Sequence, residues 1–133
     1  FVIRTHGLPR EDEEALLSLA SRFPSVRVED MTCPYVKRIH KIVSEAEQEG
    51  RTPIIIGTRT HPEIVAIAGW CQHPLIFETA EELEQWLNSD ENHCHLPLVM
   101  VSQTTSTKFL WKSCSEIVKK VCTNCKIFDI MKI

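Results

Sequence analysis

The sequence contains little glycine, no long hydrophobic run and no excess of basic residues, and each absence excludes a class of function. Only four of the 133 residues are glycine, so neither a glycine-rich phosphate loop nor a dinucleotide-binding fingerprint is present. The longest apolar runs, residues 53–57 and 96–101, are far too short to cross a bilayer. The net charge is −3 and no basic stripe occurs. We therefore expect neither a membrane nor a nucleic acid as a partner.

The composition is that of an ordinary folded domain in a reducing compartment. Apolar residues make up 43% and charged residues 25%, which excludes a disordered or fibrous chain. The six cysteines are too sparse and too irregularly spaced for a disulfide scaffold. We expect reduced thiols in the cytoplasm, some of them available for metal or redox chemistry. No secretory signal is expected, because no basic segment followed by a long apolar segment opens the sequence.

Strand-like apolar runs alternate with helical patterns along the whole chain. Continuous apolar runs such as Ile54-Ile55-Ile56 are typical of strands that helices cover on both faces. The alternation predicts an α/β fold with a parallel sheet and helices on both faces. The expected strands are residues 2–4, 26–29, 53–57, 75–77, 98–101 and 127–130. The expected helices begin near residue 9 and then span residues 34–48, 61–70, 79–87 and 106–121.

Reactive side chains follow several of these strands, at the sheet edge where parallel α/β proteins bind ligands. Cys33 comes directly before a helix that begins with Pro34, where backbone N–H groups and the helix dipole favour a thiolate. This position suits a metal ligand or a nucleophile, and a buried, inert cysteine is the alternative. His40 lies on the same helix and either approaches the Cys33 loop or is solvated. His6 and Gly7 follow the first strand, but this pair alone carries little weight.

Two further loops carry polar groups at helix starts. His61 and Glu63 flank Pro62, where a histidine can donate to an anion and a carboxylate can relay a proton. The alternative is a histidine packed in a loop and a solvated acid in a first helical turn. Thr104 offers a hydroxyl close to the start of a later helix. Ser106 is the expected N-cap of that helix.

The opposite edge of the sheet offers a second candidate site. His93-Cys94-His95 precedes the fifth expected strand, and Cys122 and Cys125 follow the next helix. A helix that returns from a parallel strand ends at the opposite edge, so these two loops are expected to meet. Cysteine and histidine are zinc ligands, although adjacent residues fit one metal poorly, and Cys122 as a core thiol is the alternative. A zinc-stabilised structural module is therefore a competing hypothesis.

Four stretches of the chain resemble the 4-hydroxy-3-methylbut-2-enyl diphosphate reductases, the LytB-type iron–sulfur enzymes that complete the non-mevalonate isoprenoid pathway. They are Val2-Ile3-Arg4-Thr5-His6-Gly7, Asp30-Met31-Thr32-Cys33-Pro34 with Val36 and His40, Ile55-Ile56-Gly57 with His61-Pro62-Glu63 and Gly69, and Val101-Ser102-Gln103-Thr104-Thr105. The stretches keep the family's order and near-family spacing over most of the chain. This combination makes the resemblance specific.

The resemblance implies a role for five residues. Cys33 is implied to be one of three cysteine ligands of a [4Fe–4S] cluster. His6 and His61 are implied to bind the substrate diphosphate through charge-assisted hydrogen bonds. Glu63 is implied to feed a proton relay, and Thr104 to hydrogen-bond the substrate. The implied reaction is a two-electron reductive dehydroxylation in the bacterial cytoplasm, giving isopentenyl and dimethylallyl diphosphate. Its implied electron donor is a protein such as ferredoxin or flavodoxin.

The resemblance also implies a domain organisation, because the family's enzymes have three similar α/β domains around the cluster. Residues 1–33 are expected to be the C-terminal part of an incomplete first domain, residues 34–130 a complete second domain, and residues 131–133 the start of a third. The first cluster cysteine would precede Phe1. Lys132 stands near the expected place of the third, so the chain is either cut there or diverges from the family.

A chain with one cluster ligand of three is expected to be inactive without the remaining N-terminal and C-terminal parts of the same protein. A further hypothesis is a non-catalytic α/β module that uses the same sheet edge to bind phosphate. That hypothesis predicts phosphate binding that survives Cys33→Ser.

Overall fold

Parallel strands organise the computed structural model, which describes residues 1–129. The elements in chain order are β1 (Val2–Ile3), α1 (Arg10–Arg22), β2 (Glu29–Asp30), α2 (Pro34–Gln48), β3 (Thr52–Ile56), α3 (Pro62–Ala68), β4 (Leu75–Phe77), α4 (Ala80–Ser89), the 3-10 helix η1 (His93–His95), β5 (Leu98–Ser102), α5 (Lys108–Val121) and β6 (Cys125–Ile127). Strands and helices alternate, which confirms the predicted α/β class. No helix within residues 1–129 is both long and apolar enough to pass through a bilayer.

The main sheet contains four parallel strands in the order β4-β3-β5-β6. Its two central strands, β3 and β5, pair along their whole length, with Ile54 opposite Met100 and Ile56 opposite Ser102. Both strands are almost fully buried, as the continuous apolar runs predict. The carboxyl ends of β3 and β5 therefore lie side by side at one edge of the sheet.

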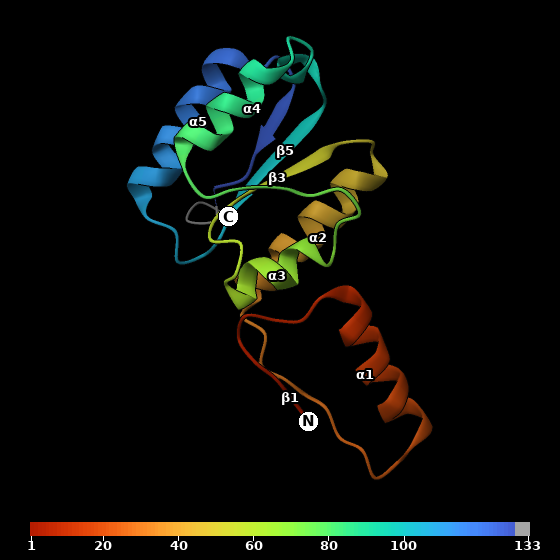
Figure 1. Ribbon diagram of the computed structural model, residues 1–133. Helices are drawn as coiled ribbons and strands as arrows, with labels where there is room; N and C mark the ends of the chain where they lie inside the picture. The colour runs from red at the N-terminus through yellow and green to blue at the C-terminus, as the bar shows by residue number, and fades with distance from the viewer. Residues whose placement is uncertain (130–133) are drawn as a thin grey trace.

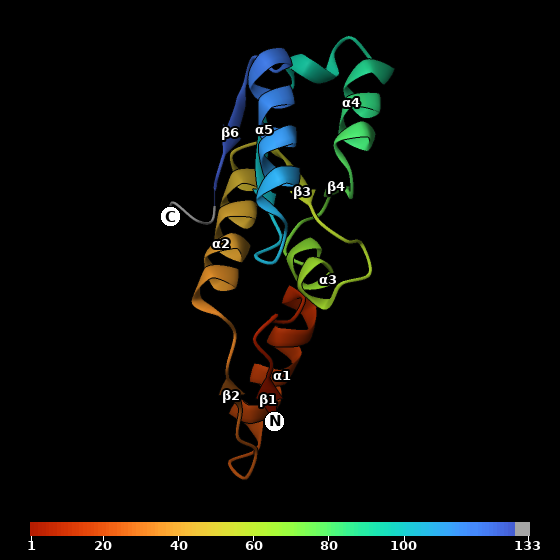
Figure 2. The same cartoon turned by 90° about the vertical axis from the view of Figure 1, so that its left-hand side faces the viewer.

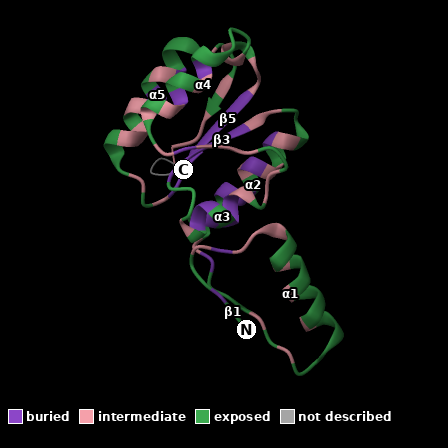
Figure 3. Ribbon diagram, in the orientation of Figure 1, coloured by how far each residue is buried: buried purple, intermediate pink, exposed green. Residues whose placement is uncertain are grey.

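Successive residues of β3 face two different helical layers, because side chains alternate across a strand. Ile54 and Ile56 belong to a core with residues of α4 and α5, whereas Ile55 belongs to a second core with residues of α2 and α3. Figure 1 shows α4 and α5 on one side of β3 and β5 and α2 on the other, and Figure 2 shows β6 and β4 at opposite edges of the sheet. In Figure 3 the buried segments concentrate in β3, β5 and the inward sides of α2 and α3. The prediction of helices on both faces is confirmed.

The N-terminal segment forms a separate two-stranded parallel sheet. In it β1 pairs with β2, with Val2 opposite Glu29 and Ile3 opposite Asp30. In the described structure α1 buries none of its thirteen residues. Figure 1 shows this segment below α2 and α3, apart from the main sheet.

The loop between β1 and α1 joins this segment to the main sheet at the C-terminal end of α3. The indole Nε1–H of Trp70 donates to the Leu8 carbonyl at 2.8 Å, and the Arg10 N–H donates to the Gly69 carbonyl at 3.4 Å. A Cβ atom at position 69 would overlap Pro9, so glycine permits this close approach of the two backbones. These contacts give the loop after β1 a defined place relative to α3.

The predicted bounds of α2 and β4 are confirmed, but the prediction of a strand over residues 26–29 is wrong. The Val26 N–H donates to the Phe23 carbonyl in a turn that follows α1. Pairing with the short β1 then begins only at Glu29, so β2 contains just two residues.

The start of the last helix also differs from the prediction. The hydroxyl of Thr107 accepts a hydrogen bond from the Leu110 N–H at 3.1 Å, so Thr107 is the N-cap and α5 begins at Lys108. Ser106, the predicted cap, donates to the Ile56 carbonyl of β3 at 3.4 Å instead.

The last strand, β6, spans Cys125–Ile127 and so begins two residues before the expected start at residue 127. Ile130, at the end of that expected strand, and residues 131–133, including Lys132, lie outside the described residues. The division into domains at residues 33 and 130 remains a prediction.

Candidate functional site

The loops that follow β3 and β5 start next to each other at the carboxyl edge of the main sheet. The Gln103 N–H, directly after β5, donates to the Ile56 carbonyl at the end of β3 at 2.9 Å. From this point one loop leads to His61 and Glu63, and the other leads to Thr104. Parallel pairing thus brings together residues that are about forty positions apart in the sequence.

His61 is the N-cap of α3 and presents one ring nitrogen to the helix. Its Nδ1 accepts a hydrogen bond from the Glu63 N–H at 3.1 Å, and Pro62 occupies the first helical turn. Because Nδ1 is an acceptor here, the remaining ring nitrogen Nε2 is the N–H donor of His61. The cap therefore orients the ring and leaves one N–H donor for a ligand at the sheet edge.

Glu63 is a buried carboxylate, with 3% of its surface exposed. One of its oxygens accepts a hydrogen bond from the Thr104 N–H at 2.6 Å, and the other accepts one from the Thr104 hydroxyl at 2.8 Å. Hydrogen bonds to an ionised group are among the stronger ones in proteins. The predicted alternative of a solvated first-turn acid is wrong, because both carboxylate oxygens are engaged by the loop after β5.

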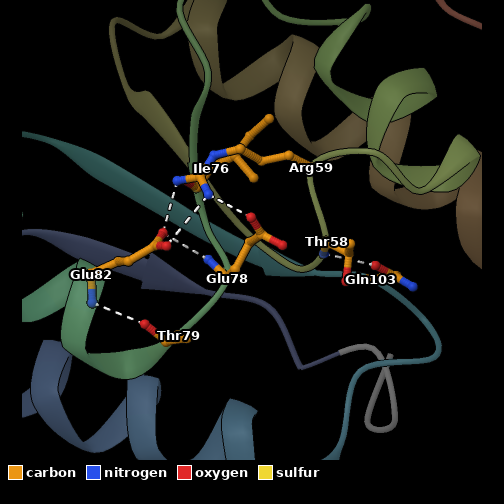
Figure 4. Close-up of polar contacts among 7 residues, drawn as sticks. All are labelled: Thr58, Arg59, Ile76, Glu78, Thr79, Glu82 and Gln103. Atoms are coloured by element: carbon orange, nitrogen blue, oxygen red, sulfur yellow. Dashed lines mark hydrogen bonds and ion pairs between the residues drawn. The ribbon is translucent and has the colours of Figure 1, made fainter.

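Gln103 fixes the distance between the two loops (Figure 4). Its side-chain oxygen accepts a hydrogen bond from the Thr58 N–H at 3.1 Å, while its side-chain NH₂ donates to the Thr105 hydroxyl at 2.5 Å. The side chain is buried, with 7% exposed. The sequence places Gln103 among the polar residues of this edge, but its bridging contacts were not predicted.

Arg59 anchors the loop that precedes His61 to the neighbouring strand β4, as Figure 4 also shows. Its guanidinium donates to the Glu78 carboxylate at 2.6 Å, to the Glu82 carboxylate at 2.7 Å and to the Ile76 carbonyl at 2.8 Å. Hydrogen bonding to Arg59 lowers the pKa of Glu82 below its ordinary value. All three side chains are substantially exposed, so these ion pairs position the loop more than they stabilise the fold.

A backbone hydrogen bond joins the loops that carry Cys33 and His6. The Cys33 N–H donates to the Thr5 carbonyl at 2.9 Å, one residue before His6. Cys33 is the N-cap of α2, yet its thiol makes no capping hydrogen bond within residues 1–129. Both Cys33 and His6 are partly exposed. The predicted alternative of a buried Cys33 is therefore wrong, and within residues 1–129 its thiol is not used in the helix cap.

The Cys33 loop is held in place by Asp30. One Asp30 carboxylate oxygen accepts hydrogen bonds from the Thr32 N–H at 3.0 Å and the Thr32 hydroxyl at 2.6 Å, and the other pairs with Lys37 at 2.6 Å. Partial burial raises the pKa of Asp30, but the hydrogen bonds from Lys37 and Thr32 outweigh it and lower the pKa overall.

The five predicted site residues thus form two groups in the structure. His61, Glu63 and Thr104 are joined by hydrogen bonds, and His6 and Cys33 are adjacent through Thr5. The loop after β1 packs on the end of α3, so the second group is attached to the element that carries the first.

At the opposite edge the two predicted loops do meet. The Thr123 N–H donates to the Cys94 carbonyl at 2.9 Å, and the Thr123 hydroxyl lies 3.3 Å from His95 Nδ1. Nevertheless, no three His, Cys, Asp or Glu side chains among residues 1–129 are arranged to hold a metal ion. Burial raises the pKa of the Cys125 thiol to about 12. The described structure does not support the predicted zinc site.

The side chains of the two groups have three kinds of chemistry. A buried carboxylate bonded to a hydroxyl can hold a proton beside a ligand, an oriented histidine N–H can bind an anion, and an accessible thiol can bind a metal. An α/β fold with such groups is suited to bind an anion and to move a proton. More particularly, the family model of the LytB protein matches residues 1–131, and the chain belongs to this family.

Relatives of the chain include 4-hydroxy-3-methylbut-2-enyl diphosphate reductases from several bacteria. The one from Clostridioides difficile (strain 630) is 33% identical over 114 residues, which are 84% of this chain and 37% of that protein. The one from Helicobacter pylori (strain Shi470) is 32% identical over 130 residues, which are 96% of this chain and 43% of that protein. The chain thus spans about two-fifths of the length of these relatives.

Two solved structures are similar in fold to this chain. A structure of (E)-4-hydroxy-3-methyl-but-2-enyl diphosphate reductase superimposes with a TM-score of 0.79 and 28% identity, covering 97% of this chain and 43% of that one. The reductase from Plasmodium falciparum has a TM-score of 0.77 at 20% identity, covers 96% of this chain and 37% of that one, and shows the shared fold.

The contact between Glu63 and Thr104 predicts a measurable coupling. Thr104→Val should lower the free energy of unfolding by about 1–3 kcal/mol, because it leaves a buried carboxylate oxygen without its donor. Thr104→Ser keeps the hydroxyl and should recover most of the loss. In a Glu63→Gln background the valine substitution should cost less, by about 0.5 kcal/mol or more. Urea unfolding of the four proteins of this cycle measures the effect, and an equal cost in both backgrounds would contradict the coupling.

Proposed function

We propose that these residues belong to a 4-hydroxy-3-methylbut-2-enyl diphosphate reductase and form part of its active site. The observation that carries the proposal is the buried Glu63 carboxylate, which is bonded to Thr104 and follows the oriented His61. The proposed reaction takes up two electrons and two protons, breaks the allylic C–O bond, and releases water with isopentenyl or dimethylallyl diphosphate. The hydroxyl leaves as water, so it requires a proton donor in its immediate vicinity.

Glu63 and Thr104 are suited to deliver that proton. The Thr104 hydroxyl is held by the Glu63 carboxylate at 2.8 Å, and it is only partly buried. A substrate hydroxyl beside Thr104 can accept a hydrogen bond from the Thr104 hydroxyl. A proton on Glu63 then passes to the Thr104 oxygen while the Thr104 hydroxyl proton passes to the leaving oxygen. Burial of Glu63 keeps bulk water away from the carboxylate, and Thr104 is the residue proposed to contact the substrate.

His61 and His6 are proposed to bind the diphosphate group. The Nε2–H of His61 is free of the helix cap, because Nδ1 accepts the Glu63 N–H. His6 is partly exposed in the loop after β1. Two imidazole donors from different loops can bind separate phosphate oxygens, and each hydrogen bond is strengthened by the charge of the ligand.

Cys33 is the residue proposed to hold an iron–sulfur cluster. The residue is partly exposed and its thiol is unused by the helix cap, which fits a thiolate ligand at a helix start. When bound, a [4Fe–4S] cluster would supply the electrons for the reduction. Residues 1–129 contribute only Cys33 to the proposed cluster site, so the proposed holoenzyme takes its further ligands from other parts of the protein, and the 133 residues alone are expected to be inactive.

The proposed enzyme also requires an electron donor and the remaining parts of the same protein. An electron-transfer protein such as ferredoxin or flavodoxin would reduce the enzyme in the bacterial cytoplasm. The remaining parts of the same protein would pack on the N-terminal segment, whose helix α1 buries none of its residues in the described structure. Leu17, Leu19 and Phe23, all exposed here, provide apolar surface for that packing.

Replacement of Cys33 tests the cluster assignment. Anaerobic reconstitution of the full-length protein with iron and sulfide should give a stable iron–sulfur absorption spectrum. Cys33→Ser should weaken or abolish that spectrum and lower the iron content. Cys71→Ser is the matched control, because burial raises the pKa of that thiol to about 12 and it lies in the segment between α3 and β4. This control should retain the cluster.

Two outcomes would argue against the reductase. If the wild-type protein takes up no cluster, the iron–sulfur assignment fails. If phosphate binding then survives Cys33→Ser, a non-catalytic phosphate-binding module accounts better for the same sheet edge.

A second prediction concerns His61. Asparagine caps helices well, so His61→Asn should preserve the start of α3 while removing the Nε2–H donor. We expect KM for the diphosphate substrate to rise about tenfold or more, as the loss of a charge-assisted hydrogen bond implies. His73→Asn, at an exposed position outside the site, is the matched control. Steady-state kinetics with unchanged KM for His61→Asn would remove this residue from the diphosphate site.

A further inference from the structure

His40 is a buried imidazole whose role the proposed chemistry does not explain. It lies on the inner side of α2 with 5% of its surface exposed, so the predicted alternative of a solvated side chain is wrong. Within the described part of the chain, its Nε2 has no hydrogen-bond partner. Burial lowers the pKa of His40 to about 4, although the charge of Asp30 acts in the opposite direction. The ring is therefore uncharged at neutral pH.

The two sides of this ring contact different parts of the chain. The indole of Trp70, just beyond α3, stacks on it with the ring centres 5.1 Å apart and the planes 19° from parallel. The backbone of Gly7 approaches it from the loop after β1. A Cβ atom at position 7 would lie 2.8 Å from His40 Cε1 and 3.3 Å from the Thr32 methyl carbon. Gly7 also has a φ of +77°, so glycine is required for both space and backbone conformation.

Trp70 holds the same loop at the following residues. Its Nε1–H donates to the Leu8 carbonyl at 2.8 Å, and the guanidinium of Arg10 lies 5.1 Å from the centre of its ring. Arg10 also donates to the hydroxyl of Ser44 on α2. His40 and Trp70 therefore form one surface, the His40–Trp70 pair, on which residues 7–10 rest.

His6 lies between two fixed points of this loop. On one side, the Thr5 carbonyl accepts the Cys33 N–H at 2.9 Å. On the other side, Gly7 rests against His40. Because both neighbours of His6 are held, the position of the His6 side chain depends on where the His40 ring places Gly7.

We infer that His40 is a positioning residue, which seats Gly7 against the His40–Trp70 pair and so sets the place of His6 in the diphosphate site. The inference rests on the proposed function, which assigns His6 to the diphosphate. His40 itself contacts neither substrate nor cluster in this account. The requirement is for a flat ring that stacks on Trp70 and contacts Gly7, and the ring nitrogens take no part in it.

The test uses the reconstituted full-length protein with 4-hydroxy-3-methylbut-2-enyl diphosphate as the probe. His40→Ala should raise KM about tenfold, with iron content and kcat changed less than about twofold, because a shift of an ångström in a binding group is costly while Glu63 and Thr104 are untouched. His40→Phe keeps a flat ring on Trp70 and should raise KM less than His40→Ala does, although its larger ring crowds Gly7. Gly7→Ala should reproduce the His40→Ala effect from the other side of the contact.

Double variants separate this inference from the function on which it rests. In a His6→Ala background, His40→Ala should raise KM no further, because the group that it positions is already absent. An additional increase in that background, or an unchanged KM in His40→Ala alone, would overturn the inference. Equal losses of iron, kcat and KM in His40→Ala and His40→Phe would also overturn it and assign His40 to the fold as a whole.

Two further outcomes are decisive. If His6→Ala alone leaves KM unchanged, the assignment of His6 to the diphosphate fails, which is a failure of the proposed function. If His40→Ala does not fold, Gly7→Ala alone decides the inference, and a wild-type KM in that variant would overturn it.

Discussion

The parallel, in-register pairing of β3 with β5 is the constraint on which the candidate site depends. Ile56 lies opposite Ser102, so both strands end at the same level and their loops leave the sheet side by side. Only this arrangement allows Glu63, on the helix after β3, to accept two hydrogen bonds from Thr104, in the loop after β5. Gln103 then joins the two loops to each other, and Arg59 joins the loop after β3 to β4. The sheet is thus the scaffold, and a few long-range hydrogen bonds complete the site.

The second constraint is the attachment of the N-terminal segment to the main sheet. The β1–β2 pair is short and α1 is exposed, so the position of this segment depends on the loop after β1 and its contacts with α2 and α3. That loop carries His6 and contacts the Cys33 loop through Thr5. A site built from the two parts of the chain therefore requires the joint at Gly7, Trp70 and Gly69 to be rigid.

The sequence was sufficient for the elements that local pattern determines. The helical period and Pro34 predict α2, and the apolar run around Ile55 predicts a central strand. Both patterns lie within a short stretch of sequence, so they can be recognised without knowledge of the fold. His61, Glu63 and Thr104 follow two strands of the main sheet at one edge, as predicted. The prediction of the same edge for His6 and Cys33 is wrong, because β1 and β2 form a separate sheet. Thr107 as the cap of α5 was missed because Ser106, one residue earlier, is an equally good capping residue type.

Contacts between residues far apart in the sequence were not predictable from these patterns. Glu78 and Glu82 are 19 and 23 residues from Arg59, and nothing local marks them as its partners. The burial of His40 likewise depends on Gly7 and Trp70, each about thirty positions away. Such contacts arise from the way the loops meet in the folded chain, which no single stretch of sequence determines.

The most direct test of the account is anaerobic turnover by the reconstituted full-length protein, with a reduced viologen dye as the electron source. The account predicts that wild type oxidises two dye molecules for each five-carbon diphosphate formed, and only when substrate is present. Glu63→Gln should retain the cluster and bind substrate but turn it over about a hundredfold more slowly, as expected for the loss of a proton donor. A wild-type protein with a full cluster and no turnover, or a Glu63→Gln variant with the wild-type rate, would contradict the account.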